Sequence, residues 1–268
     1  MPAMRVAIAG LGAIGRALAI ALHKGIPGLA LSAVVSGHAE KAQAWLDRQA
    51  IKCPVVAADE LPRLADIAVE CAPAQNLAQI CRPMLQAGKQ VMVLSAGALL
   101  RQPELIELAR ENGGRIVVPT GALLGLDAVA AAAQGEIRSV RMVTRKPPQG
   151  LKGAPWLERH GISVDGLTQA KMVFSGNARD AAEGFPANVN VAAALSLAGI
   201  GPDRTLIDIW ADPAVTRNCH TIEVESDSAR FSLSIENVPS ENPKTGKIVA
   251  LSVLAALRKL NAPLAIGT

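Results

Sequence analysis

The chain has 268 residues, of which 50% are hydrophobic and 2% aromatic, and its formal net charge is +4. This composition provides enough apolar material for one large domain or two ordinary ones. Lysine and arginine are scattered along the chain and few aromatic side chains can stack on bases, so a nucleic-acid partner is not expected. A modest positive charge suits small anionic ligands such as dinucleotides and dicarboxylates.

The cysteines point to a reducing compartment. Cys53, Cys71, Cys81 and Cys219 form no C-x-x-C pair and have no histidine cluster nearby at zinc spacing. Scattered cysteines of this kind are usually reduced and buried as small apolar side chains in cytosolic proteins. No metal site is therefore expected. The sequence also shows no signal-peptide pattern and no apolar run of ~18 residues. We therefore expect a cytoplasmic protein with no membrane partner.

The N-terminal stretch contains the most informative motif. Val6–Ala9 is a short apolar run, as expected for a strand buried on both faces, and a helix is expected over Ile14–Leu22. Between them Gly10, Gly12 and Gly15 have the spacing G-x-G-x-x-G. In a dinucleotide-binding turn these glycines permit a sharp bend, close approach of a pyrophosphate and tight packing of helix on strand.

The free N–H groups and the dipole of that helix would hold the phosphates. The predicted cofactor-binding residues are therefore Gly10, Gly12, Ala13, Ile14 and Gly15. The alternative is a glycine-rich turn that has kept the fold and lost the ligand.

Strands and helices alternate up to about residue 120. Strands are expected at Leu29–Val35, Asp66–Ala72, Gln90–Leu94 and Arg115–Pro119, and helices at Glu40–Ala50, Leu77–Ala87 and Pro103–Glu111. This alternation predicts an α/β fold, with a Rossmann domain (a doubly wound parallel sheet) over residues 1–120. Small-residue loops at 71–73 and 95–97 follow two of the strands and should flank the nicotinamide half of the cofactor, because such sheets bind ligands at that edge. Ala72 is therefore a further cofactor-binding candidate.

The choice between NAD and NADP stays open. An acidic residue ~20 positions beyond the last glycine usually binds the ribose 2′-hydroxyl of NAD. Ser36, Gly37 and His38 occupy that region, so no carboxylate repels a 2′-phosphate. His38 either meets such a phosphate or is a solvated loop residue, and we expect the cofactor to be NAD or NADP.

The pattern changes after Thr120. An alanine-rich helical segment is expected over Gly121–Ala133, a loop region over Lys146–Asp165 and a helix over Asn188–Leu197. Strands are expected at Ile137–Arg145, Leu167–Ser175, Thr205–Trp210, Arg217–Glu225 and Ala229–Asn237. Residues 121–240 are predicted to form an α+β substrate and dimerisation domain whose sheet packs on one face. Within 241–268, the segment Lys247–Arg258 is apolar nearly all round, which predicts a buried helix returning to the nucleotide domain.

Histidine is the side chain best suited to proton transfer near neutral pH. Among the four histidines, His220 is distinct because period two places it on the apolar face with Ile222 and Val224. An ionisable group there needs a partner or a purpose, and the pattern leaves both a core and a catalytic histidine open. Asn188 and Asn190 enter an apolar helix, where one of them can cap the helix and the other can contact a ligand.

Several blocks in this order resemble the L-aspartate dehydrogenases, and the resemblance spans the chain. The matching stretches are MRVAIAGLGAIG from Met4, SAGAL from Ser95, PTGALLGLDAVAAA from Pro119, FPANVNVAAAL from Phe185, RNCHTIEVES from Arg217 and ENPKTGKIVALSVLAAL from Glu241. The resemblance implies NAD(P)-dependent oxidative deamination of L-aspartate to iminoaspartate, which then feeds NAD biosynthesis or is hydrolysed to oxaloacetate and ammonia. It implies that His220 is the active-site residue, that Asn190 contacts the cofactor and that the backbone near Leu124 does so too. The family often has glycine at the position of Leu124.

This reaction requires a base, because hydride leaves the substrate Cα only after the ammonium has lost a proton. His220, or a water that it orients, is the candidate general acid/base. The two substrate carboxylates need cationic or N–H partners, and the available cations are Arg145, Lys146, Lys152 and Lys247.

Two other functions remain open. One is a reductase of the homoserine dehydrogenase or dihydrodipicolinate reductase kind, and the other is a non-catalytic dinucleotide-binding sensor. Many dehydrogenases of this build pair through the sheet of the second domain, so we expect a homodimer by analogy.

Overall fold

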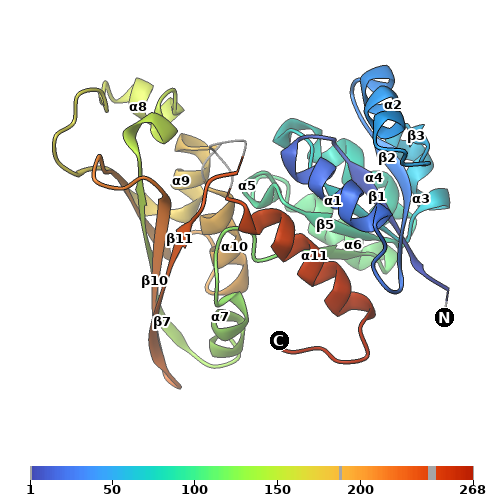
Figure 1. Cartoon of the computed structure of the whole chain (residues 1–268). Coiled ribbons are helices and arrows are strands. Elements are labelled where there is room, and N and C mark those ends of the chain that lie inside the picture. The colour runs from blue at the N-terminus through green and yellow to red at the C-terminus, as the bar shows by residue number, and fades with distance from the viewer. Residues whose placement is uncertain (1, 187–188, 241–245, 268) are drawn as a thin grey trace. The chain divides into compact units, whose positions relative to one another are not determined.

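The structure is a computed structural model that describes residues 2–186, 189–240 and 246–267 (Figure 1). These residues divide into two compact units. The first lies within Met1–Pro119 and Ala250–Ile266, and the second mainly within Thr120–Val249.

The first unit is built on a parallel sheet. Its strands are β1 (Met4–Ala9), β2 (Leu29–Val35), β3 (Val55–Val56), β4 (Ile67–Glu70), β5 (Gln90–Val93) and β6 (Arg115–Val117). They have the order β3-β2-β1-β4-β5-β6 and every neighbouring pair is parallel. The strand order reverses between β1 and β4, and doubly wound sheets bind ligands at the carboxyl edge beside such a point. The predicted Rossmann fold is confirmed.

Helices cover both faces of this sheet. They are α1 (Ala13–His23), α2 (Ala39–Arg48), α3 (Leu61–Leu64), α4 (Leu77–Gln86), α5 (Ala96–Leu99), α6 (Glu104–Asn112) and α11 (Ile248–Asn261), with short 3-10 turns η1 (Ala58–Glu60) and η2 (Ala74–Asn76). Val6 and Ile8 belong to a core cluster with Leu18 of α1, whereas Ala7 and Ala9 belong to a second cluster on the opposite face. Such alternation follows from the two-residue period of a strand.

Helix α11 packs on the first unit as predicted, but it is not buried all round. Val253 and Leu257 are 0% exposed and join the core cluster of β1 and α1, whereas Leu251 is 61% exposed. The expectation of burial all round was therefore wrong, because the helix packs through one stripe and apolar residues are common on protein surfaces. Residues 241–245, which open the matching block, lie outside the described residues.

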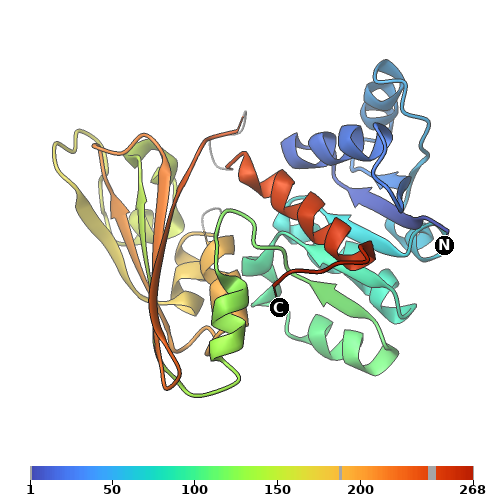
Figure 2. The ribbon, with the colours of Figure 1, turned by 60° about the horizontal axis from the view of Figure 1, so that its bottom comes forward.

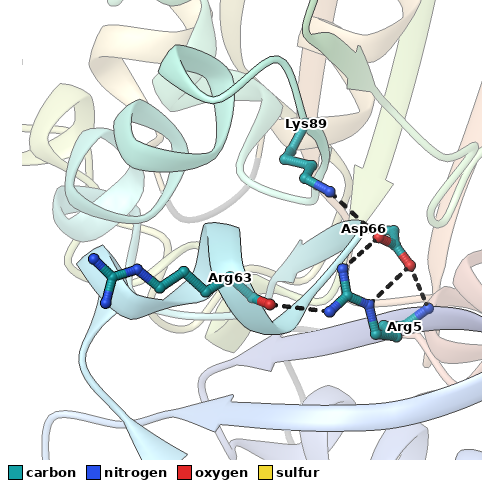
Figure 3. A network of polar contacts seen from close by, with 4 residues as sticks. All are labelled: Arg5, Arg63, Asp66 and Lys89. Carbon is teal, nitrogen blue, oxygen red and sulfur yellow. Dashed lines mark hydrogen bonds and ion pairs between the residues drawn. The ribbon is translucent and has the colours of Figure 1, made fainter.

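The amino ends of the central strands are joined by an ionic network (Figure 3). The Asp66 carboxylate accepts hydrogen bonds from Arg5 N at 2.9 Å, Arg5 Nε at 3.2 Å and Arg5 Nη2 at 2.8 Å, and Lys89 Nζ lies 3.4 Å away. Arg5 Nη1 also donates to the Arg63 carbonyl at 2.9 Å. The hydrogen bond from the Arg5 side chain holds the pKa of Asp66 well below its usual range. This network lies at the sheet edge opposite to the predicted cofactor site.

The second unit contains a mixed sheet. Its strands are β7 (Ile137–Lys146), β8 (Lys171–Asn177), β9 (Thr205–Ala211), β10 (Asn218–Ser226) and β11 (Arg230–Asn237), in the order β11-β10-β7-β9-β8. Strands β7 and β9 are parallel and the other neighbours are antiparallel. The helical elements are η3 (Pro148–Leu151), α7 (Leu126–Ala132), α8 (Pro155–Arg159), α9 (Ala178–Gly184) and α10 (Asn190–Ala198). Helices α7, α9 and α10 lie on one face of the sheet (Figure 2).

Tertiary contacts explain where the predicted elements of this unit differ. The region expected to be a loop contains α8, whose first residue is Pro155, a residue favoured at the first helical position. Trp156 fixes this helix by packing edge-on against Phe174, with ring centroids 4.9 Å apart, and by donating to the Val173 carbonyl. The alanine-rich helix begins at Leu126 because Gly125 has φ +68°, outside the helical region. Asn188 lies outside the described residues.

Candidate functional site

The glycine turn has the geometry of a dinucleotide cradle. Gly10 has φ +102°, and a Cβ there would lie 2.7 Å from the Cys71 carbonyl oxygen. A Cβ on Gly15 would lie 1.9 Å from the Gly10 oxygen, whereas one on Gly12 would meet nothing within 4 Å. Gly10 and Gly15 are therefore required by close packing. Gly12 borders open space where a pyrophosphate can approach the backbone.

The start of α1 fits the same group. Gly12 is its N-cap and supplies no side-chain cap, and the first turn holds no acidic residue. Ala13 is exposed and Ile14 is half-buried, so the first-turn N–H groups are available to an anion. A Cβ on Gly10 would also lie 2.9 Å from Ala72 Cα. The structure thus brings Ala72 against the glycine turn, as a shared site requires.

The end of β2 keeps the cofactor preference open. His38 is exposed, and its N–H donates to Ser36 Oγ at 3.2 Å. No carboxylate occupies positions 36–38. These residues therefore favour neither NAD nor NADP, and both remain predicted cofactors.

In the second unit, His220 lies on β10 and is 3% exposed. Its neighbours across the sheet are Thr144 of β7 and Ile235 of β11. Thr144 Oγ1 lies 3.1 Å from His220 Nδ1, within hydrogen-bond distance. This contact orients the ring through Nδ1, so that Nε2 is the nitrogen to consider for a ligand.

Lys146 is a second buried base on the same face of this sheet. It lies two residues beyond Thr144 on β7 and is 4% exposed, so its predicted place in a loop was wrong. Burial, and to a smaller extent repulsion from the Lys146 charge, lowers the pKa of His220 to about 3. Burial also lowers the pKa of Lys146 to about 8. The imidazole is therefore neutral near pH 7.

The other candidate cations lie elsewhere. Strand alternation directs Arg145 to the opposite face of the sheet, where it pairs with Asp212 at 3.0 Å and lies 4.8 Å from the Trp210 ring. Lys152 is paired with Asp165, and Lys247 is exposed. Of the four cations considered, Lys146 is the one that shares a sheet face with His220.

The loop carrying Leu124 is held against the β10–β11 part of the sheet. The Asn237 side chain is buried and donates from Nδ2 to the Ala122 carbonyl at 2.9 Å. A Cβ on Gly125 would lie 2.1 Å from Leu233 Cδ1. Leu124 itself is half-buried, and Asn190, exposed, begins α10. Sequence reasoning missed Thr144 and Asn237, because both act through pairings distant in the sequence.

Comparisons with known proteins agree across the chain. The family model described as aspartate dehydrogenase, C-terminal, matches residues 127–260, and that described as homoserine dehydrogenase, NAD binding domain, matches residues 10–119. An L-aspartate dehydrogenase of Bradyrhizobium diazoefficiens is 59% identical over 99% of this chain and 94% of its own length. L-aspartate dehydrogenase 3 of Bordetella bronchiseptica is 58% identical over 98% of this chain and 97% of its own. The chain belongs to the aspartate dehydrogenase family.

The fold agrees with this family. A crystal structure of aspartate dehydrogenase from Thermotoga maritima, 24% identical, covers 98% of this chain and 99% of its own with a TM-score of 0.77. This aspartate dehydrogenase family member is an oxidoreductase that uses NAD(P), as expected. In its described part, no group of three or more His, Cys, Asp or Glu side chains could hold a metal ion. No helix among the described residues is long and apolar enough to cross a membrane.

Proposed function

We propose that the chain catalyses the NAD(P)-dependent oxidative deamination of L-aspartate to iminoaspartate, with His220 as general acid/base. The observation that supports this role best is the buried imidazole, oriented by Thr144 through Nδ1. The relatives named L-aspartate dehydrogenase support the substrate. The iminoaspartate is then either hydrolysed or used in NAD biosynthesis. The reaction that consumes it decides between these two fates.

The proposed division of labour is simple. The cofactor, when bound, accepts the hydride from the substrate Cα. The protein residues that would bind it are Gly10, Gly12, Ala13, Ile14, Gly15, Ala72, Leu124 and Asn190. His220 Nε2 takes the proton from the substrate ammonium, so that the nitrogen lone pair forms the C=N bond as hydride departs. In the reverse direction the same atom returns the proton to the amine nitrogen, after hydride addition to the iminium carbon.

Lys146 is the proposed partner of a substrate carboxylate. Its buried ammonium lies on the His220 face, and burial in a low-dielectric site strengthens attraction to an anion. A carboxylate bound there would offset the repulsion between Lys146 and a protonated His220. Substrate binding would thus raise the basicity of His220 where a base is needed.

The decisive experiment is steady-state oxidation of L-aspartate with NAD and NADP side by side, at alkaline pH where free amine is abundant. We expect aspartate-dependent reduction of at least one cofactor and no comparable rate with homoserine. Oxidation of homoserine but not of L-aspartate would favour the homoserine dehydrogenase alternative. Cofactor binding without turnover of any amino acid would favour a sensor.

The assembly proposed for this enzyme is a homodimer formed through the open face of the second sheet. Leu206 of β9 and Met172 of β8 are 46% and 48% exposed, which leaves apolar area there for a second copy. Light scattering after size exclusion tests the dimer, and a monomer at micromolar concentration would contradict it. The free cysteines support a reducing, cytoplasmic location.

A further inference from the structure

A buried carboxylate stands where the strand order of the first sheet reverses. Glu70 is the last residue of β4 and is 0% exposed. It lies between Ala9 of β1 and Val93 of β5 in the sheet register. Glutamate is almost never fully buried unless it is paired or functional, and the chemistry proposed above does not use this one.

Its hydrogen-bond donors come from the loops that follow β4 and β5. Glu70 Oε2 accepts from Ser95 N at 2.9 Å and Leu94 N at 3.2 Å, and Oε1 accepts from Ser95 Oγ at 3.0 Å. The Ala72 N–H also donates to this carboxylate. Burial raises the pKa of Glu70, and the hydrogen bonds from these donors oppose that rise. Several donors converging on one carboxylate favour its ionised form.

Those loops belong to the cofactor edge of the sheet. The Cys71 oxygen and Ala72 Cα lie so close to Gly10 that a Cβ on Gly10 would be 2.7 Å and 2.9 Å from them. In a doubly wound sheet a dinucleotide crosses the carboxyl edge at the switch point, with one mononucleotide on each side. The β1–β2–β3 side receives the half bound by the glycine turn and its ribose. The β4–β5 side, where Glu70 lies, receives the nicotinamide half.

We propose that Glu70 is a positioning residue for the cofactor whose fixed negative charge favours the oxidised form over the reduced form. The nicotinamide ring is cationic when oxidised and neutral when reduced, so a buried anion on that side of the switch point attracts only the former. The attraction is strong because the carboxylate is shielded from water. This inference rests on NAD(P) binding but not on the oxidation of L-aspartate.

The test is Glu70→Gln, with the Kd of NAD⁺ and of NADH measured by calorimetry in the absence of any amino acid. We expect the ratio Kd(NAD⁺)/Kd(NADH) to rise about tenfold, mainly through weaker NAD⁺ binding. Glu70→Asp and Ser95→Ala keep the carboxylate charge and alter its contacts. Both are expected to keep the ratio within about twofold, even where each Kd increases.

An unchanged ratio in Glu70→Gln, including one in which both constants rise together, would overturn the proposal and leave Glu70 a structural residue. If Glu70→Gln does not fold, the ratio is measured in the unsubstituted protein at neutral pH and at a pH low enough to protonate Glu70. A ratio that rises on protonation supports the proposal, and a ratio that stays constant overturns it. Since no amino acid is present, none of these results bears on aspartate oxidation.

Discussion

The two units of this enzyme hold their candidate functional residues in different ways. In the first unit, the groups proposed to contact ligands belong to the backbone. Gly12 borders open space at the start of α1, and loop N–H groups surround Glu70. In the second unit, the candidate groups are side chains on strands, where His220 of β10 and Thr144 of β7 face one another. The proposed cofactor binding thus depends on chain conformation, and the proposed proton transfer depends on strand register.

The buried ionisable groups differ in the same sense. Burial raises the pKa of Glu70, whose charge is compensated by dipoles of the surrounding loops. Burial lowers the pKa of His220 to about 3 and of Lys146 to about 8. The first unit therefore holds a buried carboxylate surrounded by hydrogen-bond donors, whereas the second holds two buried bases whose pKa values are lowered. Variants that affect one unit and spare the other test this division.

The largest expected effect is on turnover in His220→Ala. Loss of the general acid/base should lower kcat by on the order of 10²-fold or more, while the Kd of the cofactor changes less than about twofold. The matched control is His160→Ala, since His160 is exposed and stacks on Trp156 with ring centroids 3.9 Å apart. Full turnover of His220→Ala would remove this residue from the mechanism.

Lys146→Met should act mainly on substrate binding. Removing the cation is expected to raise the KM for L-aspartate by on the order of tenfold, with a smaller change in kcat. The pKa of His220, followed by NMR titration, should rise because the repulsion from Lys146 is gone. Lys152→Met, which removes a surface cation paired with Asp165, is the control. Equal KM values for the two variants would refute the assigned role.

Thr144→Val should have a moderate effect. The variant keeps the shape of the side chain and removes the hydroxyl that contacts His220 Nδ1, so kcat should fall about fivefold, the equivalent of one hydrogen bond. Thr144→Ser restores the hydroxyl and is expected to recover most of the lost rate. No recovery in Thr144→Ser would attribute the loss to packing.

The smallest expected effect is a change of stability without a change of catalysis. Asp66→Asn weakens the ion pair with Arg5 and should lower the free energy of unfolding by only about 1 kcal/mol. The loss is small because the Asp66 side chain is 36% exposed and water screens its charge. The folded pKa of Asp66 lies below its unfolded value, so its contribution is present above the ordinary aspartate pKa and is lost as pH falls below that range. Urea unfolding at neutral and acidic pH measures both effects. Glu104→Gln, at an exposed pair with Arg82, should change stability less.

The sequence predicted some elements closely because their signals are local. Strand β2 occupies Leu29–Val35 as expected, and the period of β10 placed His220 on a buried face. Helix α8 and the exposed side of α11 were not foreseen, because Trp156 contacts and the packing stripe of α11 depend on distant residues. Lys146 was placed in a loop, since the end of a strand has no local signal here.

What the sequence determined alone was the cofactor turn: glycine spacing is itself the structural requirement, because only glycine tolerates the φ of Gly10 and the contact at Gly15. What only the tertiary structure decided was the environment of the ionisable groups. Thr144 contacts His220 although the two residues are 76 positions apart, and Glu70 accepts hydrogen bonds from the loop that follows the next strand. A pKa depends on everything that surrounds a group in space, and that surrounding exists only once the sheet register is formed.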